Sequence, residues 1–429
     1  MTGSAATVPL NRLDEFFLGL DHDEQPWNVH VEARMADRLE PERLADAICT
    51  AARRHPIARA RLAAWRYTDR EYRWEIADTI PHAPLEVVEC GDDAALGAAR
   101  ENLLSLSPSL EAAPPFAALL AQGPGDGDSI VLNVNHAAAD GIGALRLLRS
   151  ILRAYAGEDD PIPPLDPLAV RDVRALAGSS SVMDGMVRMR ALARNALSQW
   201  QPPTRLATAG AGGAGYGAEL FVLSPEETEA VRGRRTDGAT VNDVMLAALV
   251  VAIRRWNAEH GRRARRVTLS MPVNLRPREW KCEIVGNFAS YVSVGGGVAD
   301  DLRTTVQVIS RQTRAIKRDG LAGLVVDLLA GPSRMTIAAK RRLPELIPLT
   351  GDLVVDTASL ANLGAIEPLG DDVEAVWFSP PGRMPLGAAI GVAGHLDRLH
   401  IALRHRRAQF DAPAASRFAG LFREVLLEG

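Results

Sequence analysis

The chain has 429 residues, of which 47% are hydrophobic and 24% are charged, and its formal net charge at pH 7 is −4. This is the composition of an ordinary soluble globular protein, and the length favours two domains or lobes over one small core. The slightly acidic charge excludes a global cationic field for nucleic acid or anionic lipid. We therefore expect no nucleic-acid partner.

The cysteines and the N-terminal residues indicate the compartment. Cys49, Cys90 and Cys282 are far apart and form no C-x-x-C pair, which argues against a structural zinc site and a disulfide framework. The N-terminus has no basic segment followed by an apolar one, so no signal peptide is predicted. The longest apolar run, 241–253, contains polar residues and is too short to span a bilayer. We expect a cytoplasmic, monomeric protein without a transmembrane segment.

Residues 1–156 are predicted to form a first α/β unit. In "PERLADAICTAARRHP" (41–56), apolar residues recur on one helix face and Pro56 ends the helix. A turn-rich cluster, "GPGDGD" (123–128), precedes an apolar strand. In chain order, this unit contains a helix at 41–56, strands at 72–78 and 85–90, a helix at 93–106 and a strand at 129–135.

Residues 157–217 are predicted to be a linker, and residues 218–429 a second α/β unit. The linker is acid- and Pro-rich at first and Gly/Ala-rich at its end, with a helix at 182–200. The second unit contains a helix that is predicted to be buried. Thr240 is its N-cap, Asp243 is the capping-box partner, and Gly261 ends the helix. Strands follow at 266–273, 289–294, 353–362, 373–380, 387–396 and 398–406, and a helix at 412–429. Two α/β halves of similar size suggest a pseudo-dimer.

One short element concentrates the candidate chemistry, "NVNHAAADGIGALRLL" (133–148). A strand ends near Asn135, a helical pattern begins after Gly141, and His136 lies at the start of the connection. Catalytic groups often lie on loops that a rigid scaffold positions. A neutral imidazole could take a proton from an attacking hydroxyl or amine. Asp140 could hold the loop or fix the imidazole tautomer, and Gly141 permits close backbone approach or a positive φ.

Other interpretations of the same residues stay open. His136 and Asp140 could be a structural polar pair, since such short patterns specify function loosely. A metal site is disfavoured because no third ligand follows at suitable spacing. The chain has no G-x-S-x-G elbow and no reactive cysteine context, so no covalent acyl-enzyme is expected.

Two groups of arginines are candidate docking residues. Arg146, Arg149 and Arg153 lie on one side of the helix after Gly141, where a solvated face is favoured over a patch for an acidic carrier protein. "GRRARR" (261–266) is interpreted as a surface turn, with contact to a coenzyme A phosphate or a carrier protein as the alternative.

Several segments together resemble one protein superfamily. "NHAAADG" resembles the H-H-x-x-x-D-G signature of chloramphenicol-acetyltransferase-like enzymes, which include nonribosomal peptide condensation domains and wax ester synthases. "RRHPIARARL" (53–62), "TVNDVMLAALVVAIRRW", "MPVNLRP", "VGNFASYVSV" and "LANLG" are similar to further family segments in the same order. The similarity runs from about residue 10 to the C-terminal helix.

The resemblance implies an α/β fold of two chloramphenicol-acetyltransferase-like lobes, a V-shaped pseudo-dimer with the active-site tunnel between them. His136 would be the general base and Asp140 a structural residue in a salt bridge, with Arg59 as its best positional match and Arg276 in reserve. Backbone near Gly141 is the candidate for stabilising the oxyanion. By the same resemblance, the residues expected to line the tunnel are Asn135, Asn287 and Asn362.

The resemblance also implies the activity: transfer of an acyl group from a coenzyme A or carrier-protein thioester to an alcohol or amine. No permanently bound cofactor is expected, and the partners would be a small-molecule acceptor and a possible acyl or peptidyl carrier protein. Alternatives are a catalytically silent module that recruits a partner protein and epimerisation of a carrier-bound substrate. The chain departs from the family pattern at Asn135, where the first His is usual, and at Ala361, where Ser is usual.

Overall fold

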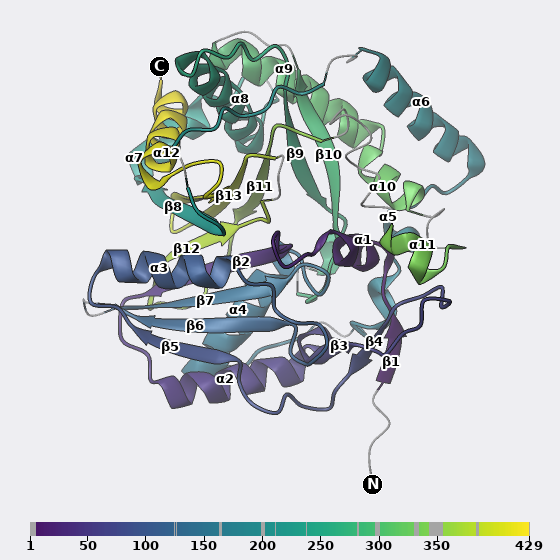
Figure 1. Cartoon of the computed structure of the whole chain (residues 1–429), viewed down its shortest axis with the longest axis vertical. Coiled ribbons are helices and arrows are strands. Elements are labelled where there is room, and N and C mark those ends of the chain that lie inside the picture. The colour runs from purple at the N-terminus through teal and green to yellow at the C-terminus, as the bar shows by residue number, and fades with distance from the viewer. Residues whose placement is uncertain are drawn as a thin grey trace.

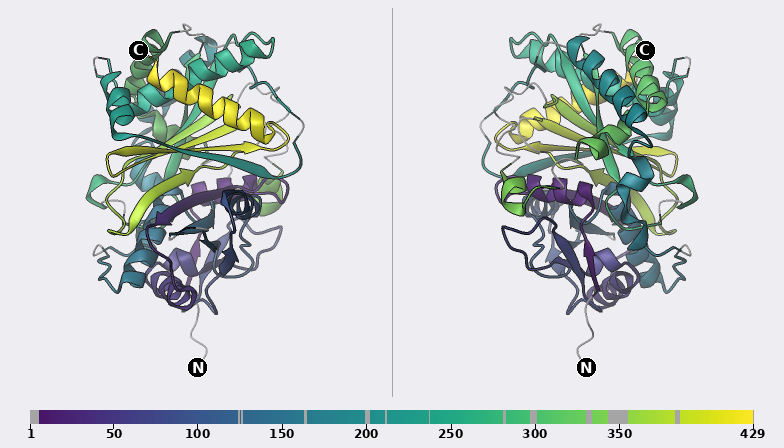
Figure 2. Two further views of the ribbon diagram at one scale, coloured as in Figure 1. Left: turned by 90° about the vertical axis from the view of Figure 1, so that its left-hand side faces the viewer. Right: turned by 90° about the vertical axis from the view of Figure 1, so that its right-hand side faces the viewer.

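The computed structural model folds the chain into two α/β lobes, which Figure 1 shows one above the other. Figure 2 shows the same arrangement from both sides, with the purple and blue N-terminal half below the green and yellow C-terminal half. Cys282 lies outside the described residues. The structure describes residues 6–123, 125, 127–162, 165–198, 202–210, 212–236, 238–280, 283–296, 301–329, 334–342, 355–382 and 386–428.

A five-stranded sheet forms the centre of the lower lobe. Its strand order is β12 (Val373–Ser379), β2 (Asn28–Met35), β7 (Asp128–Asn135), β6 (Phe116–Gln122) and β5 (Leu85–Glu89). One face carries α2 (Pro41–Arg54) and α4 (Gly141–Ala156), and the other carries α3 (Asp93–Leu104). Alternation along β7 places Ile130, Leu132 and Val134 against α2 and α4, and Val131 on the α3 side.

β12 comes from the C-terminal part of the chain but belongs to the lower lobe. It pairs antiparallel with β2, from Val373 opposite Met35 to Ser379 opposite His30. This differs from the predicted division, in which all of 218–429 forms the second lobe. The strand itself was predicted, but period-two alternation shows only that a strand exists and not which sheet it joins.

A six-stranded sheet forms the upper lobe. Its strand order is β10 (Ala289–Gly296), β9 (Val267–Asn274), β11 (Ala358–Ala365), β13 (Ala388–His395), β14 (Arg398–Arg406) and β8 (Tyr216–Leu223). β9, β11 and β13 run parallel, and the other neighbours are antiparallel. Its outer face is covered by α7 (Pro225–Gly233), α8 (Val241–Glu259), α9 (Leu302–Arg318) and α12 (Ala412–Leu427).

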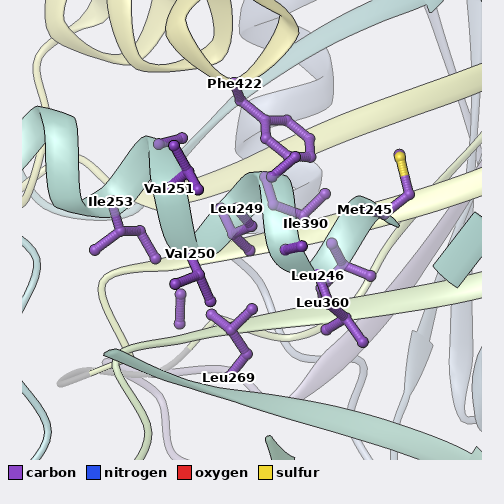
Figure 3. Close-up of a cluster of buried hydrophobic side chains, with 14 of the residues drawn as sticks. Met245, Leu246, Leu249, Val250, Val251, Ile253, Leu269, Leu360, Ile390 and Phe422 are labelled. Carbon is purple, nitrogen blue, oxygen red and sulfur yellow. The ribbon is translucent and has the colours of Figure 1, made fainter. Parts of the chain in front are cut away.

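The predicted buried helix is α8. Thr240 caps it in a reciprocal capping box with Asp243, and Gly261 adopts a positive φ of 67° just after its C-cap, His260. Its side chains are buried nearly all around, packed between the sheet and α12. Figure 3 shows this packing, with Leu249 and Val250 of α8 near sheet residues and Phe422 of α12.

The smaller elements lie along one side of the molecule, on the right in Figure 1. A three-stranded sheet has the order β1 (Ala6–Pro9), β4 (Arg73–Ile76) and β3 (Ala60–Leu62). The remaining helices are α1 (Arg12–Leu20), α5 (Val173–Ala177), α6 (Val182–Ser198), α10 (Leu324–Leu328) and α11 (Ile337–Arg341). α5 and α6 lie within the predicted linker, and α1 lies at the junction of the two lobes (Figure 1). Within the described residues, no helix combines the length and apolarity that crossing a membrane requires.

Candidate active site

His136 lies where the sequence placed it, directly after β7 and before α4. Its backbone N–H donates to the Trp27 carbonyl at 2.9 Å, so β2 and β7 together hold the residue. Asp140 is the N-cap of α4 and accepts from the Gly143 N–H at 2.8 Å. The predicted strand, short turn and helix are therefore confirmed. The residue that carries the imidazole is held between the end of β7 and the start of α4.

The His136 ring is enclosed by aromatic side chains. Phe17 of α1 stacks on it with ring centroids 4.2 Å apart, and Trp27 lies beyond at 6.5 Å. Nε2 lies 3.1 Å from the Tyr291 hydroxyl, which β10 supplies from the other lobe. Burial lowers the pKa of His136 to about 4, against the opposing effects of its own backbone carbonyl and of Asp140. The imidazole is therefore neutral at pH 7 and can accept a proton.

The partner of Asp140 is Arg276, not Arg59, so the first choice from the sequence is wrong and the reserve candidate is correct. Arg276 follows β9 in the upper lobe and forms two bonds to the carboxylate, of 2.7 and 2.9 Å. Arg59 instead donates to the carbonyls of Ala52 at 3.1 Å and Asp78 at 2.9 Å. Arg59 therefore bonds to backbone carbonyls near the end of α2 and just after β4. Similarity in sequence position alone could not show whether Arg59 or Arg276 reaches Asp140.

Asp140 is ionised in a buried position because its partners compensate for the lost water. Burial opposes ionisation, but the Arg276 guanidinium and the N–H groups of Gly143 and Phe288 outweigh it and lower the pKa of Asp140. The Phe288 N–H donates at 2.8 Å. The Asp140 N–H in turn donates to the Gly286 carbonyl at 3.2 Å. Residues of the upper lobe therefore hold the loop that carries His136 through an ion pair and backbone hydrogen bonds.

The three asparagines expected in the tunnel have different positions. Asn362 lines the cavity, whereas Asn135 and Asn287 are absent from its lining and lie buried behind the His136 loop. Asn287 donates to the His136 carbonyl at 2.9 Å. Asn135 accepts from the Ala137 N–H at 3.0 Å and donates to Asp21 at 2.8 Å. The first-His position of the family motif is therefore occupied here by a residue that shapes the turn.

A cavity of about 500 Å³ lies between the lobes, a volume typical of small-molecule sites. Its wall is mostly apolar, which favours exclusion of water from the imidazole. His136, Asp140, Gly141 and Ile142 contribute from the motif. The other lining residues are Phe16, Phe17, Leu20, Trp27, Val29, Ser270, Pro272, Asn274, Ala289, Tyr291, Val325, Val355, Asp356, Ser359, Ala361, Asn362, Leu363, Phe378, Pro380, Pro381 and Leu386.

Gly141 is required for close approach rather than for a positive φ. A Cβ atom at this position would lie 2.5 Å from Phe378 Cε2 and 3.2 Å from Leu363 Cδ2. Phe378 belongs to β12, the strand that crosses between the lobes. The glycine thus lets β12 pack directly on the start of α4.

The arginines of α4 do not form the predicted solvated face. Arg146 is 1% exposed and forms ion pairs with Asp160 and Glu283. Arg149 is also buried against Glu283, and Arg153 pairs with Asp160. Helical spacing showed that these residues share a side, but the acidic segment after α4 folds back over that side. The segment 261–266, by contrast, is the surface turn that was favoured, with three of its four arginines exposed.

Several cavity residues were not singled out from the sequence. Phe17 belongs to α1 and Trp27 directly precedes β2, and neither segment carries a motif of its own. Tyr291 lies within the "VGNFASYVSV" segment. Strand alternation predicts that Tyr291 and Ala289 share a face, and both line the cavity, but this pattern does not show which face that is. In the described part of the chain, no group of three or more His, Cys, Asp or Glu residues is arranged to hold a metal ion.

The chain is similar in sequence to one protein family and to one relative from Mycobacterium tuberculosis. The family model described as Condensation domain matches residues 14–320. The chain is 37% identical to the uncharacterized protein Rv2305 of Mycobacterium tuberculosis (strain ATCC 25618 / H37Rv), over 98% of this chain and 99% of that protein.

Solved structures show the same fold at low sequence identity. The first condensation domain of the calcium-dependent antibiotic synthetase, in complex with a substrate analogue, has a TM-score of 0.72 at 15% identity, covering 99% of this chain and 96% of that one. The epimerization domain from the third module of tyrocidine synthetase B has a TM-score of 0.67 at 15% identity, with coverage of 99% and 96%. These likenesses confirm the expected fold of two chloramphenicol-acetyltransferase-like lobes. Because the family model matches well over half of the 429 residues, the protein belongs to the condensation-domain family.

Proposed function

We propose that the protein is an acyltransferase that moves an acyl group from a thioester of coenzyme A or of a carrier-protein phosphopantetheine to an alcohol or amine. The observation that carries this proposal is the neutral His136 imidazole, whose Nε2 meets the Tyr291 hydroxyl in a mostly apolar cavity between the lobes. A base with that protonation state is suited to activating a hydroxyl or amine at neutral pH.

The different surroundings of the two ring nitrogens of His136 support the role of Nε2 as base. Nδ1 is buried and has no hydrogen-bond partner on any other described residue, whereas the backbone carbonyl of His136 itself stabilises the protonated ring. Asn287 fixes that carbonyl by donating to it. A proton held on Nδ1 leaves the Nε2 lone pair for the acceptor once the acceptor displaces the Tyr291 hydroxyl.

The proposed reaction is direct attack. The acceptor oxygen or nitrogen bonds to the thioester carbonyl carbon while its proton passes to Nε2 of His136, and the carbonyl π electrons move onto oxygen. When the oxyanion collapses, the carbon–sulfur bond breaks and the thiolate takes the proton from the imidazolium. The product is an ester or an amide, and the base is regenerated.

Two sets of donors are available for the oxyanion. Gly141 and Ile142 line the cavity and are the first residues of α4, where backbone N–H groups have no intrahelical acceptor. The Tyr291 hydroxyl is the other donor, and burial raises its pKa so that it stays protonated. We assign the oxyanion to a position between Tyr291 and this helix terminus.

The test is acyl transfer measured by mass spectrometry on a panel of coenzyme A and carrier-protein thioesters with alcohol and amine acceptors. We expect product with the wild-type protein and its loss in His136→Ala, while His22→Ala, which removes an exposed imidazole, keeps full activity. An active His136→Ala variant overturns the general-base assignment. Absence of transfer across the panel, together with capture of a partner protein, favours a silent recruiting module instead.

Epimerisation is the less favoured alternative. Removing and returning a proton on opposite faces of one carbon requires two acid/base groups with the substrate between them. The Tyr291 hydroxyl contacts Nε2 at 3.1 Å, and burial raises its pKa, which makes Tyr291 a weak acid for returning the proton.

A further inference from the structure

Three serine hydroxyls form a row across the cavity face of the upper sheet. β10 pairs Ser293 with Ser270 of β9, and β9 pairs Ser270 with Ser359 of β11. Directly paired residues point to the same face, with strands about 5 Å apart. Ser270 and Ser359 both line the cavity. The row is therefore a polar band on a wall that is otherwise mostly apolar.

A carboxylate ends this band. Asp356 lines the cavity, and its Oδ1 accepts a hydrogen bond of 2.6 Å from the Ser293 hydroxyl. Burial raises the pKa of Asp356, against the opposing effects of the Ser293 and Thr268 hydroxyls and of Arg266 and Arg205 nearby. Asp140 also lines the cavity and is neutralised by Arg276, whereas Asp356 forms no ion pair with a residue that the structure describes.

A second polar atom of the band also lacks a partner. Ser359 is 7% exposed, and its hydroxyl oxygen has no hydrogen-bond partner among the described residues. A buried hydroxyl without a partner costs free energy that a bound polar group would recover. The band therefore offers unused hydrogen-bonding capacity from Ser359 in addition to the carboxylate of Asp356.

The band lies at a defined distance from the candidate base. Tyr291, which contacts His136, is paired with Pro272, two residues along each strand from the pair of Ser293 and Ser270. Two residues of a strand span about 7 Å. A ligand that reaches both places must carry two polar groups separated by a short apolar spacer.

We propose that Ser270, Ser359 and Asp356 form a subsite for an ammonium group on the acceptor substrate, at the opposite end from the atom that attacks the thioester. An ammonium group has three N–H donors, which match one carboxylate and two hydroxyl oxygens. It also places a positive charge directly on a partly buried carboxylate that forms no ion pair with a described residue, which an uncharged group cannot do. The inference rests on the proposed function and narrows its acceptors to diamines and amino alcohols.

The test measures binding, not turnover. Ligand-observed NMR titrations compare α,ω-amino alcohols of three to seven carbons with n-alkanols matched in length. We expect the wild-type protein to bind at least one amino alcohol about tenfold or more tightly than its matched alkanol. Asp356→Asn keeps the side-chain shape but removes the charge, and we expect it to abolish this preference. Asp371→Asn, at an exposed position, should leave it unchanged.

Three results overturn the inference: equal affinity for the two series in the wild-type protein, no binding of either series, or an unchanged preference in folded Asp356→Asn. Ser359→Ala gives a second check if Asp356→Asn does not fold, because it should weaken binding of the amino alcohols and not of the alkanols. His136→Ala should keep the preference. If the wild-type protein shows the preference but transfers no acyl group from any thioester, the proposed reaction fails and the ammonium subsite stands.

Discussion

Asp140 and Arg276 join the two lobes at the motif loop. The carboxylate comes from the N-cap of α4 and the guanidinium from the segment after β9, and their side chains are 5% and 0% exposed. Both oxygens are engaged, at 2.7 and 2.9 Å. The geometry of the loop that carries His136 therefore depends on the upper lobe, although every residue of the motif belongs to the lower one.

Arg276→Ala should strongly destabilise the protein. Removing one partner leaves a buried, uncompensated carboxylate, which costs roughly 3–5 kcal/mol. Equilibrium urea unfolding measures the loss. Arg59→Ala is the matched control and should cost only about 1 kcal/mol, because this side chain donates to backbone carbonyls at a partly exposed site. Equal losses in the two variants would contradict the assignment of Arg276 as the partner of Asp140.

Tyr291→Phe should lower kcat by about a hundredfold to a thousandfold and leave KM nearly unchanged, as expected for an oxyanion donor. The change removes only the hydroxyl that lies 3.1 Å from Nε2 and keeps the ring that packs edge-on against Phe17. Steady-state kinetics, with a thioester whose acyl group the wild-type protein transfers, measures the changes in kcat and KM separately. Tyr67→Phe, at an exposed ring, serves as the control. A raised KM with unchanged kcat would assign Tyr291 to ground-state binding instead.

The acid limb of the activity profile should lie near pH 4 rather than near pH 6.5. Burial lowers the pKa of His136 to about 4, so the base stays neutral and kcat/KM stays constant as the pH falls from 8 to about 5. Initial rates across this range measure the limb, and each acid-treated sample is assayed again at pH 7 to exclude unfolding. A limb near pH 6.5 would indicate a solvated imidazole.

Stability should fall with pH well before the carboxylates titrate. Burial lowers the pKa of His55 to about 3, from 6.5. Between these values the unfolded chain binds a proton that the folded protein does not, so the free energy of unfolding is highest above pH 6.5 and decreases as the pH falls. Replacing this residue, His55→Gln, should reduce the slope by up to about 1.4 kcal/mol per pH unit, measured by urea unfolding at several pH values. An unchanged slope would contradict the buried neutral state.

Gly141→Ala should impair both folding and activity. The added Cβ would lie 2.5 Å from the Phe378 ring, so β12 must shift against α4. Thermal unfolding should show a lower Tm, and Phe378→Leu in the same chain should recover part of it by making room. Gly420→Ala is the control, because a Cβ there meets nothing within 4 Å and a helix gains up to about 1 kcal/mol from the exchange. If Gly141→Ala were equally harmless, close packing of Phe378 would not be the constraint.

The sequence predicted the elements with strong local signals. The capping box at Thr240 and Asp243, the alternation of β7 and the turn at His136 are all determined by residues within a few positions of one another. Local patterns of this kind report local structure directly. They were sufficient for the strand, turn and helix that support the proposed base.

What the sequence missed or could not decide depends on pairing across long separations. Arg276 reaches Asp140 over 136 positions, and Tyr291 reaches His136 over 155. The burial of Arg146 by Asp160 depends on how the chain turns back after α4. No periodicity encodes such contacts, because they are set by packing of the lobes rather than by the residues around either partner.

Because β12 belongs to the sheet of the lower lobe but comes from the C-terminal part of the chain, the two lobes cannot be expressed as separate, independently folding fragments. A fragment that ends in the linker would lack the strand that covers β2 and would expose its unpaired N–H and C=O groups, a template for aggregation. A fragment that starts at residue 218 would carry β12 with no sheet to join. Functional halves of this protein should therefore be obtainable only by co-expression, in which the second half donates β12 to the first.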